Sequence, residues 1–360
     1  MPDPLENSVK LIQRVEKTHK NLGLPTMFAK LVDLSDLGLF LIADRGRGKT
    51  QILNTIVKIR HRDVMEVSIV TFAGVIKLAD QMSDKHFTMI NKDFSTFYTA
   101  YLKDVGVNLI ASLITDHSVK ASTGKYKIEI QNCYLSFLSA TQPQMVRGIN
   151  RLDSWESMYR DRFLRFDILY MFGTPKYTKA DPEPGEYTWE QESPNAITLP
   201  KAVREHPIYE RMKTVLMRQT SEGRCEIYLE RLLRANAYFN NRDIVIVPDL
   251  EMLELFVPNL LLDVLLSARM RAVSEPMIFN ADSYLILFHL IERGPASRAA
   301  LREHFNVSHA TLIKNLNPLL ATNIVKGTYG SDQYKVNPSW IERYIAPVIK
   351  WSKEHGIKTE

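Results

Sequence analysis

Eight residues near the start of the chain combine the side chains that hold phosphate groups. Residues 43 to 50 read Ala-Asp-Arg-Gly-Arg-Gly-Lys-Thr, directly after the apolar residues 37 to 42. Gly46 and Gly48 allow a tight turn in which successive backbone N–H groups point at phosphate oxygens. Lys49 can then reach the β- and γ-phosphates of a nucleotide, and the Thr50 hydroxyl can bind an accompanying Mg²⁺.

The order of these features is that of a P-loop: an apolar strand, a glycine-rich loop, a Lys-Thr pair and a helix. Ala43 stands where a first glycine is usual. The helix expected over residues 50–59 directs its positive amino-terminal end at the nucleotide. We therefore predict a site for ATP and Mg²⁺; a surface turn without a ligand is the alternative. The expected contacts are Ala43, Asp44, Arg45, Gly46, Arg47, Gly48, Lys49, Thr50 and Gln51.

A P-loop hydrolase also needs an acidic side chain at the end of a neighbouring strand, where it holds the water shell of the magnesium ion. Asp93 follows the apolar residues 86–90 and is our candidate for this Mg²⁺-side carboxylate. Phe94 stands where a catalytic glutamate would follow. If Asp93 is instead the second acid of the pair, Lys92 replaces the first, and a plain strand-end cap is a further alternative.

Polar side chains at the end of the apolar segment 134–139 form another part of the predicted site. Thr141 or Gln142 can contact the γ-phosphate and the attacking water from there. A plain loop start at this point is an equal alternative.

Five arginines follow within nineteen residues: Arg147, Arg151, Arg160, Arg162 and Arg165. An arginine of this group can reach the nucleotide of a neighbouring subunit and stabilise charge on the transferring phosphoryl group. Arg160 and Arg162 are the best placed, at a helix expected over residues 154–163. A solvated basic face on that helix is the alternative.

The segments that position these residues alternate between strand and helix over residues 37–174, which predicts an α/β fold with a mostly parallel sheet. The expected strands are residues 37–42, 64–71, 86–90, 134–139 and 166–172, and the expected helices are residues 50–59, 96–116 and 154–163. Residues 1–36 predict two helices, with a turn at Gly23 and Pro25 between them. Residues 175–200 predict a loop or linker, and residues 201–275 predict a helical lid.

Residues 276–360 form a last unit, within which residues 281–345 predict a winged helix-turn-helix. Three short helices, over residues 284–291, 298–305 and 309–320, precede a hairpin over residues 324–336. The third helix is expected to meet base edges or phosphates of DNA, and the hairpin to supply lysines for phosphates. The candidate DNA contacts are Ser308, His309, Thr311, Lys314, Asn315, Lys326 and Lys335. A domain that makes only protein contacts is the alternative.

The composition is ordinary for a soluble protein of two or three domains: 360 residues, 45% apolar and 24% charged. A net charge of +5 is compatible with nucleic acid as a partner but does not require it. Cys133 and Cys225 lack metal-ligand spacing and indicate reduced thiols of a cytoplasmic protein. No apolar run approaches the ~18 residues of a membrane span, so we expect no membrane partner.

Together with the P-loop, residues 224–250 resemble the AAA+ ATPases, and in particular the lid of the minichromosome-maintenance helicases and their relatives. Residues 224–237 form an Arg-led amphipathic helix, and an Arg-Asp-hydrophobic turn follows at 242–244. Arg224, Ala235 and Ala237 match the spacing of a sensor arginine and two helix alanines in that family, so the resemblance implies that Arg224 senses the γ-phosphate. The glutamate that usually follows one turn later is absent.

The resemblance covers residues 34–275 and extends to ATPases of archaeal and phage mobile elements. It implies a DNA-associated ATPase of replication-initiator, helicase or loader type. Such a protein forms a homo-oligomer, which can be a ring, and binds double-stranded DNA through the winged helix. Two alternatives stay open. One is a nucleotide-gated switch or scaffold with little hydrolysis, because no Glu follows Asp93. The other is a transcription regulator with a nucleotide-binding domain.

Overall fold

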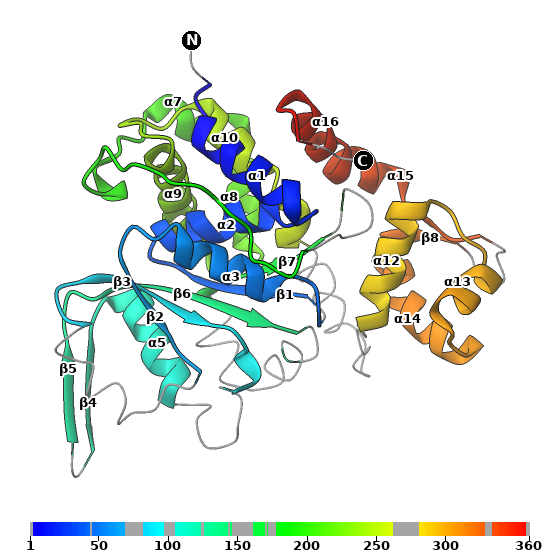
Figure 1. Cartoon of the computed structure of the whole chain (residues 1–360), viewed down its shortest axis with the longest axis horizontal. Coiled ribbons are helices and arrows are strands. Elements are labelled where there is room, and N and C mark those ends of the chain that lie inside the picture. Colours follow the sequence, from blue (N-terminus) through cyan, green and yellow to red (C-terminus); the bar gives the residue numbers. More distant parts are fainter. Residues whose placement is uncertain are drawn as a thin grey trace.

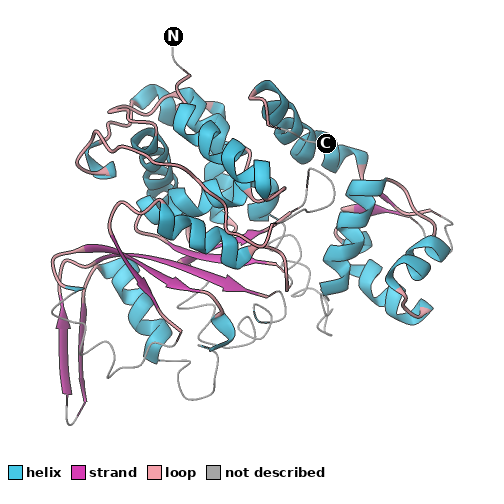
Figure 2. Ribbon diagram, in the orientation of Figure 1, coloured by secondary structure: helices cyan, strands magenta, loops and turns pink. Residues whose placement is uncertain are grey.

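A five-stranded sheet forms the centre of the chain (Figures 1 and 2). The computed structural model describes residues 3–43, 45–68, 82–96, 105–123, 126–142, 145, 161–169, 171, 178–261, 281–327 and 333–357. The strands are β1 (Gly38–Ile42), β2 (Asp63–Glu66), β3 (His86–Asn91), β6 (Tyr134–Thr141) and β7 (Phe163–Asp167). All neighbours pair in parallel, in the order β2-β3-β6-β1-β7. The predicted α/β class with a parallel sheet is confirmed.

Helices cover both faces of this sheet. The helices α2 (Gly23–Leu34) and α3 (Lys49–Lys58) lie on one face and α5 (Val105–Asp116) lies on the other (Figure 1). Successive residues of β1 therefore face different cores: Leu39 and Leu41 belong to the core on the α2 side, whereas Phe40 and Ile42 pack with α5. A strand buried on both faces must be apolar throughout, which is why residues 37–42 form a continuous hydrophobic run.

A helical layer lies above the α2 side of the sheet. It contains α1 (Glu6–Thr18), α7 (Lys201–Arg204), α8 (Pro207–Met217), α9 (Glu222–Phe239) and α10 (Val247–Glu254). The long helix α9 packs against α2 and α8. Residues 178–200 cross this layer as irregular chain with one short turn of helix at Pro194–Ala196, in agreement with the predicted loop.

The C-terminal unit lies to the side of the sheet, in orange and red in Figure 1. Its elements are α12 (Ala281–Arg293), α13 (Arg298–Phe305), α14 (His309–Ala321), β8 (Val325–Lys326), β9 (Lys335–Val336), α15 (Pro338–Trp340), the π-helical turn Ile341–Ile345 and α16 (Ala346–Glu354). Ser297 and Ser308 cap α13 and α14 by accepting backbone N–H bonds of 3.1 and 3.2 Å. The chain end returns to the helical layer, since Gln13 donates to the His355 carbonyl at 2.6 Å.

Two sequence predictions about secondary structure are wrong, and one hairpin is missing from the prediction. The turn expected at Gly23 and Pro25 lies earlier, at Asn21 with φ +70°, because a proline in the first turn of a helix loses no hydrogen bond. Strand β7 begins at Phe163, which we had placed in a helix, and ends at Asp167. The sequence prediction also lacks the antiparallel hairpin of β4 (Val119–Thr123) and β5 (Tyr126–Ile130), although residues 126–130 alternate between apolar and polar side chains and Gly124 precedes them.

The part of the chain that is described contains no helix long and apolar enough to cross a membrane. Within the same residues, no group of three or more His, Cys, Asp or Glu side chains is arranged to hold a metal ion.

Candidate functional site

The P-loop (residues 43–50) connects the carboxyl end of β1 to the amino end of α3. Gly46 and Gly48 adopt φ angles of +70° and +80°, and Gly48 is the residue before the first turn of α3. A Cβ atom at Gly48 would lie 2.4 Å from a methyl group of Leu22, whereas one at Gly46 would meet nothing within 4 Å. Both conformation and packing therefore require glycine at position 48.

Lys49 extends back across this loop. Its ammonium donates to the Ala43 carbonyl at 2.5 Å, so the side chain closes the loop from the helix to the strand end. Arg45, Gly46 and Thr50 are exposed, and Asp44 lies outside the described residues. The loop thus presents the amino end of α3, a lysine and a hydroxyl to solvent, which is an arrangement that fits the phosphates of a nucleotide.

Strand β6 brings Thr141 to the start of the P-loop. Ile42 and Thr141 are register partners, and the Ala43 N–H donates to the Thr141 carbonyl at 3.3 Å. The Thr141 side chain is buried, and its hydroxyl has no hydrogen-bond partner among the described residues. Gln142 follows, half-buried. An unpaired buried hydroxyl is costly, so this group is suited to a partner that arrives with a ligand.

The end of β3 carries an amide instead of an acid. Asn91 donates to the carbonyls of Val67 and Ser68, at 2.9 and 3.3 Å, and its side-chain oxygen accepts from the Ser139 hydroxyl at 2.9 Å. These bonds tie the ends of three neighbouring segments together. Asn91 is fully buried, and nothing in its bonding leaves it available to a metal ion.

The two residues after Asn91 are charged and lie at the surface. Lys92 forms an ion pair with Glu66 at 2.7 Å. Asp93 is exposed, and its carboxylate accepts the Ser95 N–H at 3.0 Å, as a turn-capping residue does. Asp93 therefore lies at the correct edge of the sheet, two residues beyond the strand. Its role toward Mg²⁺ stays a prediction.

Arg162, one of the arginine candidates, lies at the opposite edge. Arg162 directly precedes β7, and the register partner of Phe163 is Gly38, at the amino end of β1. A strand of five residues separates that end from the P-loop by about 16 Å. The Arg162 Nε and one terminal nitrogen are buried without a hydrogen-bond partner among the described residues. Arg160 lies outside those residues, as do Arg147 and Arg151.

Arg224 lies at this amino edge as well. Its guanidinium forms an ion pair with Asp161, which also accepts the Ser221 N–H at the start of α9. The structure therefore does not bring Arg224 to the P-loop of its own chain, and the expectation of a γ-phosphate sensor acting within one chain does not fit this arrangement. The sequence spacing located α9 correctly but carried no information about which edge of the sheet its first turn faces.

In the structure of the C-terminal unit, one candidate DNA contact does not lie at the surface. Ser308, His309, Thr311 and Lys314 are exposed or half-exposed on α14, but Asn315 is fully buried and its carbonyl accepts from the Ser283 hydroxyl at 2.7 Å. Asn315 lies three residues after Leu312 and one before Leu316, so it belongs to the core stripe of the helix. The exposed asparagine of α14 is Asn317, which helical periodicity could have identified.

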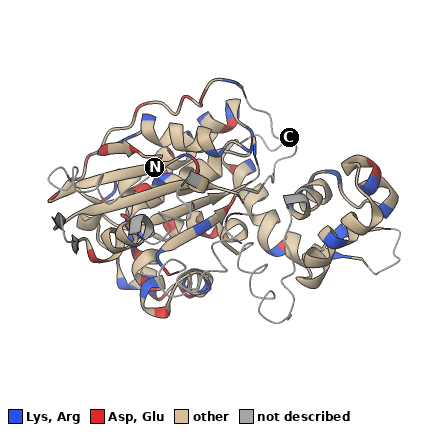
Figure 3. Cartoon of the chain, turned by 90° about the horizontal axis from the view of Figure 1, so that it is seen from below, with Lys and Arg blue, Asp and Glu red and all other residues tan. Residues whose placement is uncertain are grey.

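The hairpin of this unit places two lysines side by side. Lys326 and Lys335 are directly opposite each other in the β8–β9 pair, and both are exposed. Like charges at such positions repel and weaken the hairpin unless an anion lies between or above them. Further Lys and Arg residues lie along the helices of the unit (Figure 3).

Comparison with known proteins adds little to this geometry. No protein-family model matches the chain, and no curated protein sequence matches it. Among solved structures, the chain is similar to a presumed ATPase of Cytophaga hutchinsonii, with 13% sequence identity and a TM-score of 0.40 over 69% of this chain and 83% of that one. A similarity of this size carries no argument about function.

Proposed function

We propose that this chain is an ATPase of the AAA+ type, which couples ATP binding and hydrolysis to DNA binding through its C-terminal unit. The observation that carries the proposal is the P-loop geometry. The loop after β1 contains two glycines with positive φ and Lys49, and it leads into α3. The unpaired hydroxyl of Thr141 lies at the same edge of the sheet. Backbone donors, an ammonium and a free hydroxyl converging on one edge form a phosphate site.

The strand order supports the same proposal. Strand β6 lies between β1 and β3, so Thr141 stands between the P-loop and the segment that carries Asp93. The carboxyl edge of a parallel sheet is where such folds bind their ligands.

Each residue has a specific role in this proposal. Backbone N–H groups of the loop bind the β- and γ-phosphates, and Lys49 leaves the Ala43 carbonyl to neutralise them. Thr50 and Asp93 hold a magnesium ion and its water shell; when bound, the ion neutralises charge that develops on the phosphoryl oxygens. Thr141, or Gln142 beside it, donates to the γ-phosphate and orients the attacking water.

The proposal includes a homo-oligomer in which arginines act between chains. Arg162 has buried, unpaired nitrogens at the amino edge, and Arg224 is close to it through Asp161. Neither can reach the P-loop of its own chain across the sheet, so a neighbouring chain is the partner that fits. Mass measurement with ATP and DNA present tests this: a closed ring supports it, and a monomer under all conditions contradicts it.

The DNA part of the proposal rests on a winged-helix interpretation of the C-terminal unit. Helices α12 to α14 and the short β8–β9 hairpin follow the order expected for that module, with α14 as the helix that enters a groove. Lys314 on α14 and the facing lysines of the hairpin supply charge for phosphates. We expect Lys314→Ala to lower the salt dependence of DNA binding by about one counterion.

Lys350, exposed on α16, offers a matched control, since Lys350→Ala should leave the slope of affinity against salt unchanged. Equal slopes for wild type and Lys314→Ala would contradict a groove-binding α14 and favour the protein-contact alternative.

A nucleotide-gated switch is a second candidate function, and the end of β3 favours it. Asn91 replaces an acid there, and the Lys92–Glu66 ion pair occupies the position where a general base would act. Measuring ATP affinity and turnover separately, with and without double-stranded DNA, distinguishes the two. DNA-stimulated hydrolysis supports the ATPase, and tight binding without turnover supports the switch.

A further inference from the structure

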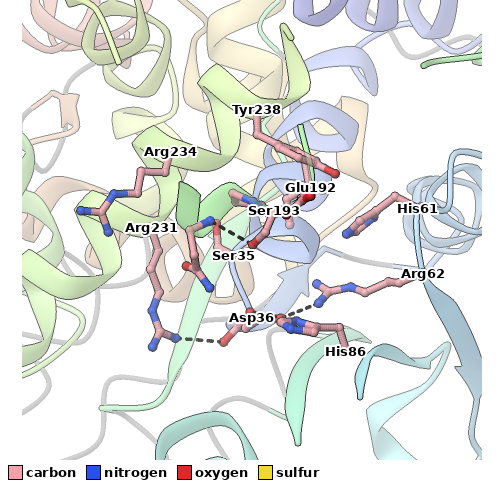
Figure 4. A pocket seen from close by; sticks show the side chains of 13 residues that line it. Ser35, Asp36, His61, Arg62, His86, Glu192, Ser193, Arg231, Arg234 and Tyr238 are labelled. Carbon is pink, nitrogen blue, oxygen red and sulfur yellow. Dashed lines mark hydrogen bonds and ion pairs between the residues drawn. The ribbon is translucent and has the colours of Figure 1, made fainter. Parts of the chain in front are cut away.

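A polar cavity lies at the amino edge of the sheet, on the opposite side from the P-loop (Figure 4). Its volume is about 170 Å³. The wall is formed by residues 34–36 before β1, residues 61–62 before β2, His86 at the start of β3, the loop 192–195 and one side of α9. Amino ends of strands, a crossing loop and a helix thus meet around a single space.

The inner charges of this cavity neutralise each other. Arg62 donates to the Asp36 carboxylate, to the Thr88 hydroxyl at 3.1 Å and to the Ser136 hydroxyl at 2.7 Å, so all its nitrogens are used. Burial opposes the ionised form of Asp36, but the Arg62 charge prevails and lowers the pKa of Asp36 to about 2. The charges of Arg62 and Asp36 therefore neutralise each other and are not available to a ligand.

Arg231 differs, because it has no carboxylate partner among the described residues. One of its terminal nitrogens donates to the Asp36 backbone carbonyl at 3.4 Å, and the other approaches the His117 ring at 3.5 Å. Both distances are at the long limit of a hydrogen bond. Burial, and then the Arg231 charge, lowers the pKa of His117.

The remaining charges of the wall do not cancel Arg231. Arg234, one turn further along α9, pairs with Glu230 at 3.3 Å. Glu192 is exposed, so solvent screens its charge. Figure 4 shows Arg231 reaching toward Asp36 inside the cavity. Of the three arginines in the wall, half-buried Arg231 is therefore the one without a carboxylate partner among the described residues.

We propose that this cavity binds a phosphate group, held by Arg231. A planar guanidinium binds a phosphate through two parallel hydrogen bonds, and it does so best where solvent is restricted. The Ser193 hydroxyl, which accepts the Asn195 N–H at 3.1 Å, keeps its own proton to donate. The volume suits a phosphate group and is too small for a whole nucleotide, since pockets for such ligands start at about 300 Å³.

Bound phosphate would connect two parts of the molecule. Arg231 belongs to α9 in the helical layer, while Asp36 directly precedes β1, whose other end carries the P-loop. The phosphate can be inorganic or part of a nucleic-acid backbone, and the chemistry of recognition is the same for both.

The test uses Lys49→Ala protein, so that phosphate binding at the P-loop does not contribute. Thermal unfolding is followed while inorganic phosphate replaces chloride at constant ionic strength. Ligand that binds only the folded state raises the midpoint. We expect this rise in Lys49→Ala, its loss when Arg231→Ala is added, and its retention with Arg211→Ala, which removes an exposed arginine of α8 that pairs with Glu254 at 2.8 Å.

A purely structural role for Arg231 gives another result: the midpoint falls without phosphate, but the phosphate-dependent rise persists, which overturns the proposal. Arg231→Lys keeps the charge without the planar fork and should bind phosphate at least several-fold more weakly. A short oligonucleotide replaces phosphate in a second series. A rise that depends on Arg231 with either ligand supports the proposal and identifies the source, and no such rise with either ligand contradicts it.

Discussion

The two edges of the sheet differ in how their polar groups are satisfied. At the carboxyl edge, Thr50 and Asp93 are exposed and the buried Thr141 hydroxyl has no partner. At the amino edge, Lys30, Asp33 and Arg62 are buried and connected to one another by ion pairs of 2.7 and 3.7 Å. The carboxyl edge therefore leaves polar groups exposed or unpaired, as our proposal of a ligand site there requires, whereas the amino edge, apart from Arg231, pairs its buried charges with one another.

This comparison makes its strongest prediction at the amino edge. Asp33→Asn should lower the free energy of unfolding by about 3–5 kcal/mol, because it leaves the Lys30 ammonium buried without its carboxylate. Lys30 is fully buried, and burial lowers its pKa. Urea unfolding measures the loss.

Glu6→Gln, at an exposed pair with Lys10 on α1, is the control and should change stability by less than about 0.5 kcal/mol. A similar small change in Asp33→Asn would mean that the amino edge is not a stabilising cluster.

At the carboxyl edge the largest effect should be on binding. Lys49→Ala should weaken ATP binding by about 100-fold, because a hydrogen bond to a charged group contributes up to about 3 kcal/mol. The unfolding midpoint should hardly change, since the side chain is only half-buried. Fluorescent-nucleotide titration gives the affinity.

Lys58→Ala removes a lysine from the last turn of the same helix, where it pairs with Glu183 at 2.6 Å, and should bind ATP normally. ATP affinity unchanged in Lys49→Ala would reject the P-loop as the nucleotide site.

Thr141→Val separates catalysis from stability. The valine methyl group replaces a hydroxyl that has no partner, so the free energy of unfolding should stay the same or rise by about 1 kcal/mol. Turnover of ATP should fall by about 10- to 100-fold if the hydroxyl contacts the γ-phosphate. A variant that is destabilised but fully active would show that Thr141 is an ordinary core residue.

A smaller effect concerns the carboxyl group of Glu16. Burial raises the pKa of the Glu16 carboxyl to about 7, although the N–H groups of Asn21 and Gly23, both at 2.7 Å, favour its ionised form. A raised folded-state pKa contributes stability that is complete below about pH 4.5 and is lost as the pH rises through about 7.

The free energy of unfolding of the wild-type protein should therefore fall by about 1 kcal/mol between pH 5 and pH 8 because of this group, with half-burial taken into account. Glu16→Gln should lack that loss in urea unfolding at the two pH values. If the free energy of unfolding changes equally with pH in wild type and Glu16→Gln, the raised pKa of Glu16 is contradicted.

Sequence reasoning located features that depend on nearby residues. The P-loop strand, α3, α13 and α14 lie within one or two residues of their predicted bounds, because apolar runs, glycines and serine caps act locally. It failed where a second element decides the outcome. Phe163 forms a strand because it pairs beside Gly38, and Asn315 is buried because α12 covers it.

The sequence alone determined that a glycine-rich loop with a Lys-Thr pair connects an apolar strand to a helix, since Gly46, Gly48, Lys49 and Thr50 act over a single turn of chain. Only the tertiary structure decided which distant side chains share that edge. Register brought Thr141 next to Ile42 and kept Arg224 on the far side, at Asp161. It also brought Arg231 of α9 to the cavity beside Asp36, because a parallel sheet collects the amino ends of its strands at one edge and their carboxyl ends at the other.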